Sequence, residues 1–171
     1  LLLATLVGVL VGILPAAAQD APFPVTIEHK YGSTTIEAAP QRVVSIGFTE
    51  QDSLFALGVQ PVGIRYWYGD ENDAIFPWAE TAAAGAEPVV LNLPYGNLDY
   101  EAILALNPDL ISANDSGITQ EEYDSLSQIA PTIAQSGDYN DFGQPWQVTT
   151  VRVGESVGKG AEAEALVSSV A

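Results

Sequence analysis

The stretch RVVSIGFTEQDSLFALGVQPVGI, residues 42–64, decides the fold of this chain. It opens with a short, almost wholly apolar segment, which is typical of a strand that is buried on both faces. Thr49 and Asp52 then resemble a capping box at the start of a helix, and Gly58 favours a left-handed stop at its end. Residues 62–64 begin a second apolar strand. Strand, helix and strand together predict a βαβ unit of a parallel sheet, which binds ligands at the carboxyl ends of its strands.

The rest of the chain alternates in the same way between short apolar strands and helices. We expect a hairpin from residues 25–28 and 34–37, strands at 88–91, 109–112 and 131–134, and helices at 75–84, 99–107, from Thr119 and from near Trp146. Thr119 and Glu122 form a capping box for the third of these helices, and Gly158 interrupts the last. The predicted fold class is therefore α/β, with a parallel sheet and an amino-terminal β-hairpin.

Residues 1–14 form an uninterrupted apolar segment that Pro15 closes. The small residues Ala16 to Ala18 follow, which resembles the hydrophobic region and cleavage site of a secretory signal without its basic start. A membrane anchor is the alternative, but the segment is shorter than the roughly 17 to 25 residues that span a bilayer. We therefore predict a signal peptide over residues 1–18 and an exported protein, either periplasmic or secreted.

The composition excludes several classes of protein. The chain has no cysteine, which excludes a disulfide scaffold and a thiolate metal site in this sequence. It carries 22 acidic residues against 5 lysines and arginines, and its formal net charge is −17. Such a surface repels the phosphates of nucleic acids, so we expect no nucleic-acid partner.

Residues suited to catalysis or metal binding are scarce. His29 is the only histidine, so a zinc site built from several histidines is excluded and a serine triad would have to use this one residue. The sequence has no G-x-S-x-G elbow and no glycine-rich phosphate loop. Asp70, Glu71 and Asp73 suggest a calcium site, but they lack the ligand order of a calcium loop, and a solvated acidic loop is favoured. We expect no catalytic residue and no metal site.

Aromatic residues follow the predicted strands. Phe48 follows the first strand, Tyr66 to Tyr68 follow the second, and Tyr95 lies in the loop after the third. Rigid rings with polar tips suit a mostly apolar cleft for a small molecule, although packing within the lobe is the alternative for each ring. A chain that reverses after a strand cannot bury three consecutive rings, so at least one is expected to be exposed. Arg65 beside them can pair with an anionic group of a ligand.

Four segments together resemble one known family, the periplasmic iron-siderophore substrate-binding proteins of ABC importers, which are related to binders of vitamin B12 and heme. In chain order they are FPVTIEHKYGSTTIEAAPQRVVSIG at 23–47, DSLFALGVQPVGI at 52–64, DYEAILALNPDLI at 99–111 and YDSLSQIAPTI at 123–133. The similarity runs from Phe23 to Ala171. It implies two Rossmann-like lobes joined by one long helix, with the ligand held between the lobes.

The resemblance also implies how this sequence is divided. Residues 19–145 would form the amino-terminal ligand-binding lobe, and residues 146–171 would begin the long inter-lobe helix. The second lobe would be missing from this sequence. Family members dock on a permease through one acidic residue on each lobe, and Glu101 stands at the matching position, seven residues before Pro108. A glutamate in the first turn of a helix is also favoured by the helix dipole, by about 0.3–1 kcal/mol.

The function implied by the resemblance is capture of a ferric siderophore and its delivery to an ABC transporter permease, by a monomer without enzymatic activity or cofactor. The candidate ligand contacts are Phe48, Arg65, Tyr66, Trp67, Tyr95, Ser112 and Asn114. Scarce basic residues favour a neutral hydroxamate or a citrate-like chelate. The alternatives are a cobalamin or heme binder, an exported α/β enzyme that draws its nucleophile and base from another lobe, and a surface receptor or sensor lobe.

Overall fold

The computed structural model describes residues 23–68 and 74–170. Outside this part of the chain lie the predicted signal peptide, residues 1–18, and the acidic residues of the calcium alternative, Asp70, Glu71 and Asp73. Within the described ranges, no helix combines the length and the apolar character that crossing a membrane requires.

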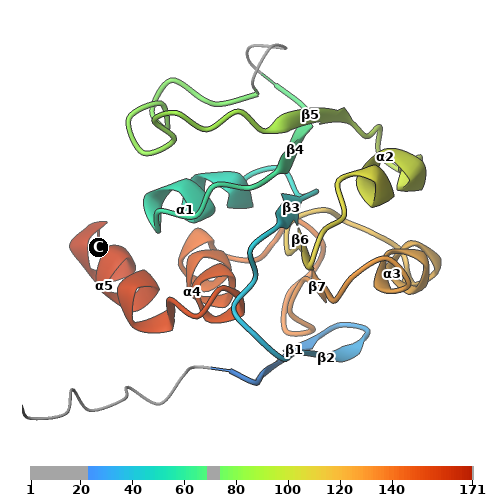
Figure 1. Cartoon of the computed structure of the whole chain (residues 1–171). Helices are drawn as coiled ribbons and strands as arrows, with labels where there is room; N and C mark the ends of the chain where they lie inside the picture. Colours follow the sequence, from blue (N-terminus) through green and yellow to red (C-terminus); the bar gives the residue numbers. More distant parts are fainter. Residues whose placement is uncertain (1–22, 69–73, 171) are drawn as a thin grey trace, which may run out of the picture.

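A parallel sheet of five strands forms the centre of the lobe, in the order β5-β4-β3-β6-β7 (Figure 1). Its strands are β3 (Val43–Ser45), β4 (Gly63–Tyr66), β5 (Val89–Asn92), β6 (Leu110–Ala113) and β7 (Thr132–Ala134). β3 lies in the middle, where Val44 is in register with Gly63 of β4 on one side and with Ile111 of β6 on the other. The prediction of a parallel sheet built on the 42–64 unit is confirmed.

Helices cover both faces of this sheet (Figure 1). On one face lie α1 (Glu50–Ala56), α4 (Trp146–Ser156) and α5 (Gly160–Val170), and on the other lie α2 (Tyr100–Ala105) and α3 (Gln120–Ser127). Leu110 packs with Val153 in the core on the first face, whereas the next residue, Ile111, packs with Leu126 in the core on the second. Because successive side chains of a strand point to opposite faces, a strand covered on both sides must be apolar throughout.

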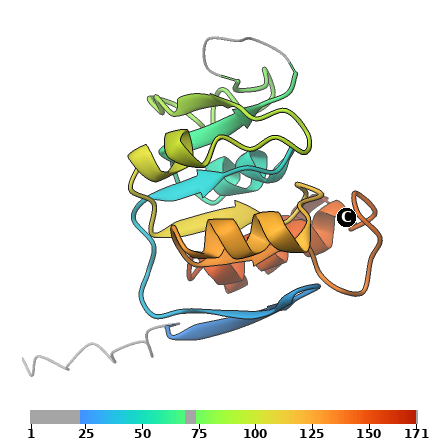
Figure 2. The ribbon, with the colours of Figure 1, turned by 90° about the vertical axis from the view of Figure 1, so that its right-hand side faces the viewer.

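The amino-terminal hairpin lies against the last strand of the sheet (Figure 2). It consists of β1 (Val25–His29) and β2 (Gly32–Ile36), which pair antiparallel as predicted. The Thr34 hydroxyl donates a hydrogen bond to the Thr132 carbonyl of β7 at 2.8 Å. The Lys30 N–H donates to the Gln135 carbonyl at 2.9 Å. The hairpin therefore occupies hydrogen-bonding groups at the outer edge of β7.

His29, the only histidine of the sequence, belongs to this hairpin contact. Its Nε2 lies 3.0 Å from the Thr34 hydroxyl and 3.3 Å from the Tyr123 hydroxyl, and the side chain is buried. Burial and, to a lesser extent, the charge of Arg152 lower the pKa of this imidazole. The ring is therefore neutral at pH 7, and its contacts assign it to packing of the hairpin against α3.

The helix predicted over residues 75–84 is wrong. This segment is a series of turns closed by backbone hydrogen bonds, such as that from the Ala83 N–H to the Ala79 carbonyl at 2.8 Å. Its alanines favour a helix, but Pro77 provides no N–H and Gly85 stands in the left-handed region with φ +79°. The turns also let Ala79 and Ala83 pack on Phe55 of α1. Tertiary packing therefore overrides the local preference.

The helix predicted after Thr49 is confirmed as α1, but its capping interactions are not. The Thr49 hydroxyl donates to the Asp115 carboxylate at 3.1 Å rather than capping the helix. The Asp52 carboxylate accepts a hydrogen bond from the Trp78 indole at 2.8 Å. Both side chains therefore connect α1 to neighbouring loops instead of closing a capping box.

The last two helices, α4 and α5, pack against each other. Gly158, with φ +74°, ends α4 and confirms the predicted interruption. The segment predicted as the start of a long inter-lobe helix, residues 146–171, thus contains two helices within the described part of the chain. Its role as a connection to a second lobe, like the boundary of the lobe at residue 145, stays a prediction.

Replacing Gly154 in α4 by alanine is expected to lower the free energy of unfolding by about 1–3 kcal/mol, because it overpacks the contact between the two helices. A Cβ at this position would overlap the Cβ of Ala163 and lie 2.8 Å from the backbone carbonyl oxygen of Lys159. Glycine to alanine in a helix interior otherwise stabilises by about 0.5–1 kcal/mol. Urea unfolding measures the change, and Gly137→Ala, whose Cβ meets only ordinary contacts, is the control. A more stable Gly154→Ala protein would contradict the prediction.

Candidate functional site

Aromatic side chains gather on the loops that follow the carboxyl ends of the strands. Phe48 follows β3, Trp67 follows β4, Tyr95 follows β5 and Phe142 follows β7. With three neighbouring rings they form a continuous series of ring contacts, which we call the aromatic rim. The aromatic rim consists of Phe48, Trp67, Tyr68, Phe76, Trp78, Tyr95 and Phe142. In an open parallel sheet this edge is where ligands bind.

The centre of the aromatic rim connects rings from distant parts of the sequence. The Phe48 centroid lies 5.3 Å from that of Trp67 and 5.7 Å from that of Phe142. Tyr95 continues the series, 6.1 Å from Phe142. Trp67 is 49% exposed, Phe142 is 49% exposed and Tyr95 is 64% exposed. Half-exposed rings that contact one another leave a connected apolar surface in water, which marks a site of interaction.

The other end of the aromatic rim runs over α1. The Phe76 ring is stacked on that of Trp78 at 4.7 Å and lies 6.4 Å from that of Trp67. Phe76 is buried, whereas Trp78 and Tyr68 are largely exposed. Since the Trp78 indole is held by Asp52 of α1, this part of the rim is anchored to the body of the lobe.

Arg65 lies beneath the aromatic rim. Its guanidinium carbon is 4.2 Å from the Phe48 ring centroid, and its Nη1 donates to the Ile46 carbonyl at 3.2 Å. The side chain is only 2% exposed, so it does not reach the open edge. Burial lowers the pKa of this guanidinium, while the charges of nearby acids, Glu50 first, oppose that shift. A cation under a ring stabilises the pair by about 0.5–2 kcal/mol, so Arg65 fixes Phe48 from below.

Glu50, in the first turn of α1, is a fully buried carboxyl group behind this edge. Its Oε1 accepts long hydrogen bonds of 3.5 Å from the Ser112 hydroxyl and from the Asp115 N–H. Its Oε2 has no partner among the residues that the structure describes. Burial, and next the negative charge of Asp115, raise the pKa of Glu50 to about 7. The carboxyl group fits only because Gly47 has no side chain, since a Cβ there would overlap it.

Ser112 and Asn114, at the end of β6, are also buried. The Asn114 amide donates to the Ser112 hydroxyl at 3.3 Å and accepts from Arg152 Nε at 3.1 Å. Arg152 in turn donates to the Ala134 carbonyl at 2.9 Å. This polar network connects the ends of β6 and β7 to α4 below the surface.

The structure therefore brings together only some of the predicted ligand contacts. Phe48, Trp67 and Tyr95 share the aromatic rim, with Phe142 between the last of them and Phe48. Tyr66 is half-buried on β4, where its side chain leaves the sheet on the face opposite to that of Arg65, and within the described residues no ring contact joins it to the rim. Arg65, Ser112 and Asn114 lie below the exposed edge.

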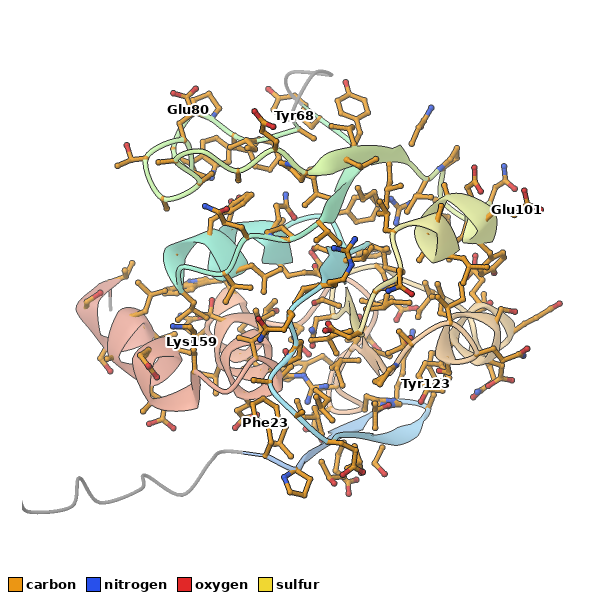
Figure 3. All side chains as sticks on the ribbon, viewed as in Figure 1. Phe23, Tyr68, Glu80, Glu101, Tyr123 and Lys159 are labelled. Carbon is orange, nitrogen blue, oxygen red and sulfur yellow. The ribbon has the colours of Figure 1, made fainter. Side chains whose placement is uncertain are left out.

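Glu101, the predicted docking residue, lies on α2, and Figure 3 shows it well away from Tyr68, one of the rings of the rim. It is exposed in the first turn of α2, and Figure 3 shows its side chain on the outer side of that helix. The Asp99 side chain caps α2 by accepting a hydrogen bond from the Ala102 N–H at 2.9 Å. A shallow cavity of about 510 Å³ borders Glu101, lined by Asn92, Pro94 and residues 97–101. No ring of the aromatic rim lines this cavity, so the rim is identified by its ring contacts and not by a cavity.

Sequence reasoning missed several members of this site. Phe142 stands in a polar loop before a predicted helix, and the signal that could have found it is its place after the last strand. Phe76 and Trp78 fall in the segment wrongly predicted as a helix. The burial of Glu50 has no signal in the sequence, because a glutamate in the first turn of a helix is usually exposed to water.

The chain is similar to known proteins over most of its length. Residues 43–171 match the family model described as periplasmic binding protein. The Fe(3+) dicitrate-binding periplasmic protein FecB of Escherichia coli is 33% identical over an alignment of 153 residues, which covers 84% of this chain and 45% of FecB. A solved periplasmic solute binding protein from Mycobacterium smegmatis is 47% identical, with a TM-score of 0.80 over 85% of this chain and 50% of that one.

A third similar protein was solved with a ligand. Streptococcus pneumoniae PiaA in complex with ferrichrome is 29% identical, with a TM-score of 0.70 over 84% of this chain and 48% of that protein. This sequence therefore spans about half the length of the relatives that it matches. The family match and the shared α/β fold confirm the resemblance seen in the four segments, and the chain belongs to the periplasmic binding protein family.

Proposed function

We propose that the complete protein captures a ferric siderophore or a related iron chelate outside the cytoplasm and delivers it to the permease of an ABC importer. The observation that carries this proposal is the aromatic rim, which lies exposed at the ligand-binding edge of a chain half as long as its relatives. A second lobe, absent from this sequence, would supply the opposite wall. FecB is named for ferric dicitrate binding and PiaA was solved with ferrichrome, and both support an iron chelate as the ligand.

The charges at the rim favour a chelate that carries little negative charge. Arg65 is buried beneath Phe48, Lys30 pairs with Asp141, and Arg152 is bound to Asn114. The remaining basic residues of the sequence are Arg42, which donates to carbonyls at the end of α2, and Lys159, between α4 and α5. None of these five cations is therefore offered to a ligand at the rim of this lobe. A neutral hydroxamate chelate fits this surface better than a highly anionic catecholate.

We further propose different roles for the predicted ligand contacts. Phe48, Trp67 and Tyr95 would touch the chelate through their exposed faces. Arg65, Ser112 and Asn114 would instead support the edge from below, because they are buried. Tyr66 has the weakest support as a contact, since it has no ring contact to the rim within the described residues. No residue of this site is proposed to perform catalysis.

Replacing Trp67 by alanine is expected to weaken binding of a ferric chelate by roughly tenfold, because exposed tryptophans at a contact surface are typical hot spots worth more than 1 kcal/mol. The affinity is measured by titrating the complete protein with ferrichrome, ferric dicitrate, heme and cobalamin. Calorimetry and tryptophan quenching are the two readouts. Val89→Ala is the matched control, because Val89 is 50% exposed but stands at the amino end of β5, the opposite edge of the sheet.

The same titrations separate the candidate functions. Binding of heme or cobalamin in preference to both iron chelates would replace the proposed ligand with a macrocycle. Chemical change of a bound chelate would favour the exported enzyme. Equal affinities of the wild-type and Trp67→Ala proteins would remove the aromatic rim from the binding site.

We also propose that Glu101 docks on the permease. Its side chain is exposed on the outer side of α2 and is free of the hydrogen bonds that cap the helix, which Asp99 makes. A chain with a net charge of −17 presents an acidic surface, which suits a partner with a basic face. Docking outside the aromatic rim would leave the ligand undisturbed while the transporter engages the lobe.

The location of the protein follows from the same proposal. We infer that residues 1–18 are a signal peptide, that residues 19–145 form the ligand-binding lobe and that residues 146–171 lead toward a second lobe. The periplasmic name of FecB and of the Mycobacterium smegmatis protein supports a location outside the cytoplasm. Sequencing the amino terminus of the exported protein tests the cleavage after Ala18.

A further inference from the structure

The loop between β7 and α4, residues 135–145, carries Phe142 into the aromatic rim between Phe48 and Tyr95. The Phe142 centroid lies 5.7 Å from that of Phe48 and 6.1 Å from that of Tyr95. Phe48 follows β3 and Tyr95 follows β5, and β4 lies between these two strands in the sheet. Phe142 therefore joins two parts of the rim that share no direct ring contact within the described residues.

The backbone of Phe142 adopts a conformation that a phenylalanine rarely takes. Its φ is +61°, in the left-handed region where a Cβ is crowded by the neighbouring carbonyl oxygen. A residue without glycine's freedom persists there only when its surroundings hold it, and such residues cluster at binding sites. The conformation at Phe142 therefore needs an explanation in its surroundings.

A buried amide holds the loop in this conformation. The Gln135 side chain is buried, and its Oε1 accepts the hydrogen bond of the Phe142 N–H at 3.3 Å. Its Nε2 donates to the carbonyls of Tyr139, at 2.9 Å, and of Asn140. Asp141, beside Phe142, pairs with Lys30 of the hairpin. One side chain thus satisfies three backbone groups of the loop, which fixes the position of Phe142 before any ligand arrives.

The Phe142 ring packs on the backbone of Gly117. A Cβ at Gly117 would overlap the Phe142 ring and lie 2.9 Å from Cε2 of Tyr95, so both rings rest on the bare backbone of this glycine. The Phe142 ring is nevertheless 49% exposed. Packing alone would not place a ring on a strained backbone and leave half of it in water, because the apolar area that remains exposed contributes nothing to folding.

We propose that Phe142 is a ligand-contacting residue that determines specificity, and that residues 135–145 form a preorganised binding loop. This inference rests on the proposed function. It adds to the predicted contacts of the rim, which follow β3, β4 and β5, a residue that follows β7. The ring would lie against the apolar, weakly charged outer surface of a hydroxamate-type chelate and bridge Phe48 and Tyr95 beneath it. Because the loop is already held by Gln135, the chelate would not have to order it on binding.

Replacing Phe142 by glycine tests the inference, because it removes the ring and relieves the left-handed backbone at the same time. In the complete protein we expect the dissociation constant for ferrichrome to rise about tenfold, as for a contact at a hot spot. We expect the thermal unfolding midpoint to stay unchanged or to rise. Phe142→Tyr keeps the ring and should restore the affinity. Val89→Ala, at the amino end of β5 and outside both the rim and the loop, should leave the dissociation constant unchanged.

The outcomes separate the inference from the proposed function. If the wild-type protein binds neither ferrichrome nor ferric dicitrate, the proposed function fails and the inference fails with it. If the wild-type protein binds a chelate and Phe142→Gly binds it equally tightly, the inference alone is overturned. A lower unfolding midpoint with an unchanged dissociation constant would identify Phe142 as a packing residue.

Discussion

Replacing Glu101 by arginine is expected to reduce chelate uptake by more than tenfold while leaving chelate affinity unchanged. If the carboxylate meets a basic residue of the permease, the substitution places two like charges against each other, which costs several kcal/mol. No ring of the aromatic rim lines the cavity that borders Glu101, so we expect the substitution to leave the ligand site undisturbed. Uptake of radioactive iron chelate by cells that carry the transporter measures the first quantity, and titration of the purified protein measures the second.

The control for this experiment must lose an equivalent charge. Glu162→Arg is well matched, because Glu162 is also exposed in the first turn of a helix, α5, on the other face of the sheet. Each substitution removes a favourable helix-dipole interaction of about 0.3–1 kcal/mol, so a general loss of stability would affect both variants alike. Weaker chelate binding by Glu101→Arg would contradict a role confined to docking.

Replacing Glu50 by glutamine is expected to remove a pH dependence of stability on the order of 3 kcal/mol, from about 1.4 kcal/mol for each pH unit between the two pKa values. Burial and the charge of Asp115 raise the pKa of Glu50 from its ordinary value of 4.5 to about 7. Between these pH values the folded protein keeps a proton that the unfolded chain releases. The stabilising contribution is therefore complete below pH 4.5 and is lost as the pH rises through 7.

The measurement is the free energy of unfolding of both proteins at intervals from pH 4.5 to 8. The difference between them should change in favour of glutamine as the pH rises, because glutamine never ionises and keeps the shape of the carboxyl group. Asp52, whose pKa is also raised by burial, contributes to both profiles and largely cancels in the difference. A constant difference for Glu50→Gln would contradict the prediction.

The framework of the lobe could be predicted because its local signals agree with its packing. The apolar start of the 42–64 stretch predicts β3 in the centre of the sheet, where both faces are covered. The capping box of Thr119 and Glu122 is present as predicted, because both partners lie within one turn of α3. In residues 75–84 the alanines favour a helix, but packing on α1 favours turns instead.

The site could be predicted only in part, because it depends on contacts between distant segments. The rings of Phe48 and Trp67 are found from their positions after strands. Phe142 also follows a strand, β7, but this position alone does not predict its contact with the rim, which depends on Gln135 and Gly117. The burial of Arg65 likewise follows from Phe48 covering it. Strand ends indicate where a site lies, and tertiary contacts decide which side chains are offered to a ligand.

The hairpin at the start of the described chain bears on the solubility of the protein. An uncovered edge strand can recruit a strand from another molecule and begin aggregation. β1 and β2 contact β7, and Thr34 and Lys30 donate hydrogen bonds to the carbonyl of Thr132 in β7 and to that of Gln135, just after the strand. The hairpin therefore covers the edge at which a strand of another copy of the lobe could pair with β7. A variant shortened by proteolysis beyond Ile36 would expose this edge and would be expected to aggregate more readily, even though every ring of the aromatic rim would still be present.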